Sequence, residues 1–194
     1  MSTMLKNSKY RAQNSKFKKQ LFALTGIFGF CFFISVLANS FYKSSLLFSL
    51  AITFGVTFYH FAMRLFVGYS VDRIFKNGIN YNSQWFSPKK FEPHLYKKLH
   101  VHKWKEKVPT FDPEQFDIEK HTFDEIISSM CVAEIVHEAI FILALLPVFL
   151  SIPFGEFWVF LITSVLSAAF DLIFVILQRY NRPRIIRLLH RKSI

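Results

Sequence analysis

The chain has 194 residues, of which 52% are hydrophobic, and it carries a formal net charge of +11. A soluble domain would intersperse its apolar residues with polar ones, whereas here they are gathered into long blocks. No recognisable nucleic-acid-binding module accompanies the charge, so we expect no nucleic-acid partner. The excess of cations is better explained as an anchor for anionic lipid, and composition therefore favours a membrane protein.

Four apolar blocks are each long enough to cross a hydrocarbon core of about 30 Å as a helix. Lipid offers backbone amides no partner, so a spanning segment must be helical unless it closes a barrel. We therefore expect an all-α membrane protein with four transmembrane helices. The blocks are Leu21–Ala38, Leu46–Tyr69, Val132–Ile152 and Phe157–Gln178.

The first block also has features of a secretory signal, because basic residues precede it and Val36-Leu37-Ala38 could serve as a cleavage site. Its apolar run of about 18 residues exceeds the usual signal core of about 7 to 15 residues. We expect a retained helix.

Basic residues predict the orientation of the spans. Six Lys/Arg precede the first span, ten lie between the second and third, and six follow the fourth, while the two short connections hold only Lys43. The positive-inside rule then places both termini and the long loop in the cytoplasm. The expected parts are a basic arm (1–20, disordered or lying on the surface), a hairpin (21–69), a cytoplasmic loop (70–121), a second hairpin (122–178) and a basic tail (179–194).

The loop contains a segment in which aromatic and aliphatic residues alternate with lysines, from Phe91 to Val108. Leu95, Leu99 and His102 recur in it at helical spacing, which predicts a short interfacial helix. Further along, a stripe with steps of three and four begins at Phe123, so the third helix is expected to start well before its apolar block.

Five ionisable residues fall inside the spans, where an unpaired charge is costly and a functional role is the default hypothesis. They are His60, Arg64, Glu134, His137 and Asp171. At about 1.5 Å per helical residue, all are placed in the half of the membrane nearest the loop. We expect them to gather in one pocket beneath the inner headgroups.

Glu134 and His137 form a Glu-x-x-His pair on one helix face. A carboxylate can orient an imidazole that acts as a general base on an alcohol. The same pair is a metal-ligand element in di-iron bundles, but that site needs a second copy, which the spans lack, so no bound metal is expected. A hydrogen-bonded structural pair is the third interpretation.

Arg64 lies one turn after His60 and cannot lose its charge, so it requires a carboxylate, either Glu134 or Asp171, or must snorkel to the interface. The fourth span ends in residues 178–184, where Pro183 is expected to stop the helix. Arginine forks in this segment suit phosphate, carboxylate or lipid headgroups.

Four segments of the chain resemble the glycosyl-4,4'-diaponeurosporenoate acyltransferases, small bacterial membrane proteins of carotenoid synthesis, and the resemblance implies a bacterial cell membrane as the location. The segments are residues 59–64 (YHFAMR), 99–109 (LHVHKWKEKVP), 133–137 (AEIVH) and 178–184 (QRYNRPR).

The resemblance implies an O-acyltransferase that moves a fatty acyl chain from a thioester, such as acyl-CoA or acyl carrier protein, to a sugar hydroxyl of a glycolipid. No other cofactor is expected. The implied catalytic residues are His137, Glu134, His60, Arg64 and His102, with Arg64 and Arg182 stabilising the oxyanion or positioning the donor. The implied substrate- and donor-binding residues are Lys103, Trp104, Lys105, Asp171, Gln178, Arg179, Tyr180, Asn181, Arg182 and Arg184.

Two other hypotheses stay open at this point. One is a non-enzymatic lipid-binding or assembly protein, in which the polar residues would hold the spans together. The other is a metal-dependent membrane oxidase, for which His100 and His102 of the loop would join His60, Glu134 and His137 as ligands.

Overall fold

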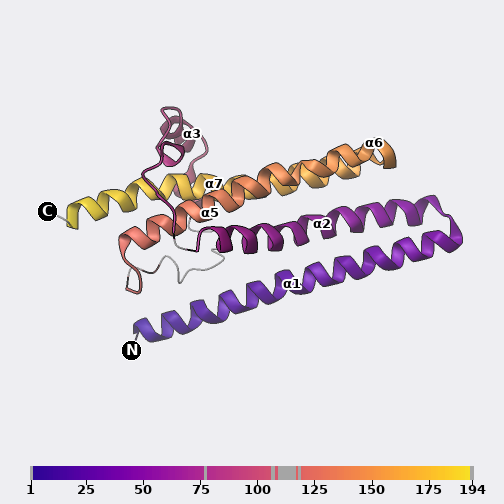
Figure 1. Cartoon of the computed structure of the whole chain (residues 1–194), viewed down its shortest axis with the longest axis horizontal. Helices are drawn as coiled ribbons and strands as arrows, with labels where there is room; N and C mark the ends of the chain where they lie inside the picture. The colour runs from indigo at the N-terminus through magenta and orange to yellow at the C-terminus, as the bar shows by residue number, and fades with distance from the viewer. Residues whose placement is uncertain (1, 77, 106–107, 109–116, 118, 193–194) are drawn as a thin grey trace. The chain divides into compact units, whose positions relative to one another are not determined.

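The computed structural model describes residues 2–76, 78–105, 108, 117 and 119–192, with side chains from residue 19 to 191 within these ranges. All regular structure within them is helical (Figure 1). In chain order the elements are α1 (Ser2–Tyr42), α2 (Ser45–Ile74), η1 (Gln84–Phe86), α3 (Glu92–Lys98), α4 (Val101–Trp104), α5 (Phe123–Ala144), η4 (Leu146–Leu150), α6 (Ser151–Phe154) and α7 (Phe157–Lys192).

Four helical segments are long and apolar enough to cross a membrane: Lys19–Tyr42, Ser45–Ile74, Phe123–Phe154 and Phe157–Arg191. They correspond to the four predicted spans, and α5 begins at Phe123, as the stripe of apolar residues predicted. The orientation of the spans across the membrane stays a prediction.

The chain divides into two compact units, which we describe separately. The loop unit comprises Met1–Phe17, Val71–His137 and Ile173–Ile194, and the span unit comprises Lys18–Ser70 and Glu138–Leu172. Helices α1, α2, α5 and α7 each contribute a part to both units.

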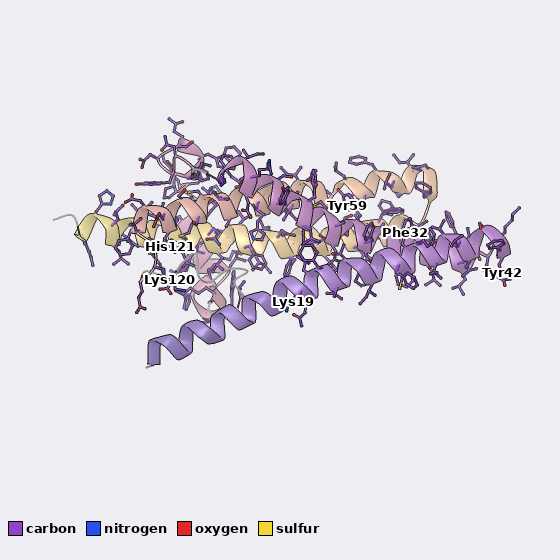
Figure 2. All side chains as sticks on the ribbon, turned by 60° about the horizontal axis from the view of Figure 1, so that its bottom comes forward. Lys19, Phe32, Tyr42, Tyr59, Lys120 and His121 are labelled. Atoms are coloured by element: carbon purple, nitrogen blue, oxygen red, sulfur yellow. The ribbon has the colours of Figure 1, made fainter. Side chains whose placement is uncertain are left out.

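In the span unit, α1 and α2 pack through reciprocal contacts between glycine and phenylalanine. A Cβ atom on Gly29 would lie 3.0 Å from the Phe58 ring, and one on Gly55 would lie 2.9 Å from the ring of Phe32, which is labelled in Figure 2. Phe28 also stacks on Phe61, with ring centroids 5.3 Å apart. Small residues let two helices approach closely, which is the usual basis of helix association in lipid.

In the loop unit, α5 starts with a reciprocal cap. The Thr122 backbone N–H donates to Glu125 Oε2 at 2.8 Å, and the Glu125 N–H donates to Thr122 Oγ1 at 3.3 Å, which is a capping box. The segment that follows α2 is bound to α5, because the Ile79 N–H donates to Ser128 Oγ at 3.0 Å. Gly78 has φ +86°, and a Cβ atom there would lie 3.0 Å from Ser128 Oγ, so a side chain at this position would be strained.

The structure differs from the sequence predictions at three places. The basic arm is helical from Ser2, as part of α1, so its disordered form is not seen. The segment from Phe91 is not one helix: His100, with φ +51°, separates α3 from α4, while residues 106–107 lie outside the described residues. Finally, Pro183 does not end α7, which continues to Lys192.

The continuation of α7 past Pro183 has a physical reason. Proline removes the hydrogen bond to the carbonyl of Arg179 and crowds it. However, ion pairs of Arg179 and Arg182 hold the turn before the proline, and Arg184, just after it, donates to the Tyr180 hydroxyl at 2.6 Å, which links the two sides of Pro183.

Candidate functional site

The centre of the loop unit is Glu134, whose carboxylate is fully buried on α5. Its Oε1 accepts from Arg179 Nη1 at 2.5 Å, and its Oε2 accepts from Arg182 Nη1. Both arginines come from α7, three residues apart, so they reach α5 from nearly the same helix face. Helices α5 and α7 are thus joined within the loop unit by a charged cluster rather than by apolar packing alone.

Arg179 extends this cluster into the loop. Its Nε donates to Glu92 Oε1 at 2.8 Å, and its Nη2 donates to the Ser87 carbonyl at 3.1 Å. Arg182 similarly donates to the Phe86 carbonyl, and its guanidinium lies 5.1 Å from the centroid of the Phe86 ring. The planar fork of an arginine suits several acceptors at once, which a lysine could not replace.

The cluster is balanced in charge. Two carboxylates, Glu92 and Glu134, face two guanidiniums, and Glu92, Glu134 and Arg182 are each at most 4% exposed. Buried charges of this kind need partners of opposite sign, since each would otherwise carry a large desolvation cost. We call Glu92, Glu134, Arg179 and Arg182 the four-charge cluster.

Tyr96 and Tyr180 connect the four-charge cluster to its surroundings. The Tyr96 hydroxyl donates to Glu92 Oε2 at 2.9 Å, and its ring meets that of Tyr180 edge to face at 5.2 Å. Burial, together with the neighbouring Glu92 carboxylate, raises the pKa of Tyr96 above its usual range. The phenol therefore stays a hydrogen-bond donor at neutral pH.

Cations surround the Tyr180 ring. The Arg184 guanidinium lies 4.1 Å from the ring centroid and donates to the Tyr180 hydroxyl at 2.6 Å. Lys105 Nζ lies 5.8 Å from the same centroid. This arrangement leaves cationic side chains at the edge of the loop unit, where Arg184 is exposed and Lys105 is half-buried.

His137 lies one turn after Glu134 and is half-buried. Its ring stacks on Phe174 of α7, with centroids 4.6 Å apart and an angle of 11° between the planes. The stacking fixes the plane of the imidazole. Because both Glu134 oxygens accept from arginines, Glu134 acts chiefly as a partner of those cations.

His102 and Lys103 on α4 are exposed. Trp104 connects the two sides of the break between α3 and α4, because its indole N–H donates to the Leu99 carbonyl at 2.9 Å. As exposed side chains, His102 and Lys103 are not part of the buried four-charge cluster. Gln178 and Asn181 are half-buried on α7.

The span unit contains a separate ion pair. Arg64 Nη2 on α2 donates to Asp171 and, at 2.9 Å, to Ser167 Oγ, both on α7. Arg64 Nη1 donates to the His60 carbonyl at 2.8 Å. Asp171 is 1% exposed, so Arg64 neutralises a buried carboxylate rather than snorkelling to the surface. Of the two predicted partners, Asp171 is the one found.

His60 lies one turn from this pair and is 5% exposed. Its ring meets that of Tyr59 edge to face at 5.5 Å, and the Tyr59 hydroxyl donates to the Leu143 carbonyl of α5 at 2.9 Å. Among the described residues, neither ring nitrogen of His60 has a hydrogen-bond partner, and the same holds for the hydroxyl of Ser164, which is fully buried.

The five ionisable residues of the spans therefore belong to two groups: Glu134 and His137 in the loop unit, and His60, Arg64 and Asp171 in the span unit. That both groups share one pocket stays a prediction. The sequence reasoning missed Glu92, Tyr96 and Ser167. A signal for Glu92 existed, since it is the one acidic residue between positions 73 and 105 of a lysine-rich segment.

No three His, Cys, Asp or Glu side chains come together as metal ligands in the part of the chain that is described. His100 and His102, which the oxidase hypothesis required, have ring centroids 6.3 Å apart on exposed side chains. The structure thus gives the oxidase hypothesis no support.

Fold and site together define a small helical membrane protein whose buried charges are paired between helices. The family model of glycosyl-4,4'-diaponeurosporenoate acyltransferase matches residues 82–191, more than half of the chain, including the whole four-charge cluster. The chain belongs to this family, which confirms the resemblance seen in the sequence. No curated protein and no solved structure matches it significantly. Membership supports a membrane acyltransferase and suggests a bacterial membrane as its location.

Proposed function

We propose that this protein is an O-acyltransferase that moves a fatty acyl chain from a thioester donor to a sugar hydroxyl of a glycolipid at the cytoplasmic leaflet. The donor would be acyl-CoA or an acyl carrier protein, and the acceptor a lipid similar to a glycosyl carotenoid ester. The observation that carries the proposal is the family match over residues 82–191.

His137 is the proposed general base. Its imidazole takes the proton of the sugar hydroxyl while that oxygen forms a bond to the thioester carbonyl carbon. Collapse of the tetrahedral intermediate breaks the C–S bond, and the imidazolium returns the proton to the departing thiolate. The stacking on Phe174 supports this role, because a base must hold its orientation toward the hydroxyl. His60 and His102 are the alternative bases.

Arg182, Arg179 and Glu134 act in this proposal as positioning residues. The charge of each guanidinium is already balanced by a carboxylate, and Arg182 is 2% exposed, so little of its field is left for an oxyanion. Their contribution is to hold α5, α7 and the loop together, which keeps His137 in place. Arg64 has the corresponding task in the span unit, through Asp171.

The donor would be held by cations at the edge of the loop unit. Lys103 and Arg184 are exposed, and Lys105 lies beside the Tyr180 ring. Ammonium and guanidinium groups bind phosphate well, and both coenzyme A and the prosthetic group of an acyl carrier protein carry phosphate. A glycolipid acceptor would enter from the bilayer.

The test uses the full chain in lipid nanodiscs with palmitoyl-CoA and a glucosyl lipid. We expect His137→Gln to reduce acyl transfer by about 100-fold or more, as for loss of a general base. His94→Gln, an exposed histidine of the same loop unit, is the matched control and should keep full activity. Equal membrane abundance of both variants is required. Full activity of His137→Gln would remove His137 from the mechanism.

A non-enzymatic lipid-binding protein is the second candidate. It is favoured by one observation, namely that the buried charges of the four-charge cluster satisfy one another. In that case neither the native chain nor any variant would transfer an acyl group. His137→Gln and variants of the four-charge cluster would differ only in how much they lower the stability of the protein.

A further inference from the structure

The span unit holds polar atoms that the Arg64–Asp171 pair does not use. These are both ring nitrogens of His60 and the hydroxyl oxygen of Ser164, all buried and without a hydrogen-bond partner among the described residues. Buried polar atoms are almost always hydrogen-bonded in folded proteins, and lipid supplies no partner. Such atoms in a span therefore indicate a polar ligand.

The register of the helices places these atoms on the same side of the ion pair, within about one turn of each other. Arg64 on α2 contacts Ser167 and Asp171 on α7. Helices α2 and α7 are parallel, because at their beginnings Ser49 donates to Glu156 at 2.5 Å, just before α7 starts. His60 precedes Arg64 by four residues and Ser164 precedes Asp171 by seven, so they lie about one and two helical turns from the ion pair, on the same side of it.

The charge of this group selects the chemistry of the ligand. Arg64 and Asp171 cancel each other, so no net charge remains to attract a phosphate or an ammonium group. In its neutral form an imidazole offers one donor and one acceptor, and a serine hydroxyl offers both. A hydroxyl group donates and accepts as well, and is complementary to this set, whereas a phosphate anion only accepts.

We propose that His60 and Ser164, which precede the Arg64–Asp171 pair along α2 and α7, form an intramembrane site for a hydroxyl of an uncharged sugar headgroup. The site is inferred from the span unit alone. The choice of a sugar as the source of the hydroxyl rests on the proposed function, because the acceptor of the reaction carries one. In this proposal His60 and Ser164 bind the acceptor lipid.

The experiment measures the thermal unfolding midpoint of the full chain in phosphatidylcholine nanodiscs, with glucosyl diacylglycerol or phosphatidylglycerol added. A ligand that binds only the native state raises the midpoint. We expect the glucosyl lipid to raise it for the native chain, and phosphatidylglycerol to have a clearly smaller effect. Ser164→Ala and His60→Gln should weaken glucosyl lipid binding by about 5- to 10-fold, as for loss of one hydrogen bond.

Ser35→Ala is the matched control. Ser35 is also buried in the span unit, but its hydroxyl donates to the Cys31 carbonyl at 2.8 Å, so it should respond to glucosyl lipid like the native chain. Without glucosyl lipid, Ser164→Ala should be at least as stable as the native chain, since the alanine removes an unpaired hydroxyl.

Three results would overturn the proposal: no response of the native chain to the glucosyl lipid, an equal response of Ser164→Ala and His60→Gln, or an equal response to phosphatidylglycerol. The first would mean that water alone occupies the site. Acyl transfer is measured on the same nanodiscs. If the native chain transfers acyl groups but both variants bind glucosyl lipid as the native chain does, this site is wrong and the proposed function stands. If the native chain binds glucosyl lipid through these residues but transfers no acyl group, the site stands and the proposed function is wrong.

Discussion

Arg182 of α7 donates to Glu134 of α5 across an interior where the two residues are 2% and 0% exposed. A buried pair of this kind is a weak source of stability compared with apolar packing, but removal of one partner leaves an uncompensated charge. The pair therefore specifies how α5 and α7 meet in the loop unit, and its members are expected to depend strongly on each other.

We expect Arg182→Met to lower the free energy of unfolding by about 3–5 kcal/mol, because Glu134 keeps only one of its two cations. The double variant Glu134→Leu with Arg182→Met should recover most of that loss, since Arg179 and Glu92 still balance each other. Denaturant unfolding in detergent micelles measures both. Arg187→Met, an exposed arginine on the same helix, is the control. Equal free energies of unfolding for the Arg182→Met and Arg187→Met variants would contradict a structural role of the Arg182–Glu134 pair.

Glu92 is expected to hold the loop to α7. Glu92→Gln weakens its bond with Arg179 and should raise the rate of protease cleavage in the loop by about 5- to 10-fold, since one charge-assisted hydrogen bond is lost. Limited proteolysis of the protein in liposomes measures the rate. Glu119→Gln changes an exposed carboxylate of the same unit and should leave it unaltered. The role of Glu92 fails if both variants are cleaved at the native rate.

Gly55→Ala should destabilise the span unit by about 1–3 kcal/mol, because the new Cβ would lie 2.9 Å from the Phe32 ring. Gly68→Ala is the matched change in the same helix, with nothing within 4 Å of the added atom, and should stabilise α2 by up to about 1 kcal/mol. Unfolding midpoints of the two variants are compared. If Phe32→Leu restores the Gly55 variant, the clash is the cause; a Gly55 variant as stable as Gly68→Ala would show that α1 and α2 do not pack in this way.

The raised pKa of Tyr96 predicts a loss of stability at alkaline pH. The unfolded chain releases the phenol proton at about pH 10, whereas the folded protein retains it, so stability falls as the pH rises from the unfolded to the folded pKa. The slope is at most about 1.4 kcal/mol per pH unit. Tyr96→Phe should lack this component when unfolding is compared between neutral and alkaline buffers. Tyr42→Phe, at an exposed position, should behave like the native chain, and an unchanged slope in Tyr96→Phe would disprove the assignment.

The sequence was sufficient to predict the four spans, the early start of α5 and the pairing of Arg64 with a carboxylate. Each depends on local signals: length, period and the cost of an unpaired charge in lipid. The chain alone could not choose between Glu134 and Asp171 for Arg64, because depth along a helix says nothing about which helices are neighbours.

The features missed from the sequence depend on distant contacts. Glu92 and Arg179 are separated by 87 positions, and nothing local to either residue marks the other as its partner. Pro183 was expected to stop α7, yet the helix continues to Lys192, with the turn before the proline held by the ion pairs of Arg179 and Arg182 to α5. Likewise His100 interrupts the helix in the segment from Phe91, although the helical spacing of Leu95, Leu99 and His102 predicted a continuous one.

Mass spectrometry of whole lipid extracts can show whether this chain transfers an acyl group to a glycolipid. Cells that make a glycosyl carotenoid ester are compared with and without the chain, and with the His137→Gln variant. We expect a lipid heavier by one fatty acyl group only with the native chain. Identical lipid profiles in all three, with the protein present in the membrane, would contradict this expectation.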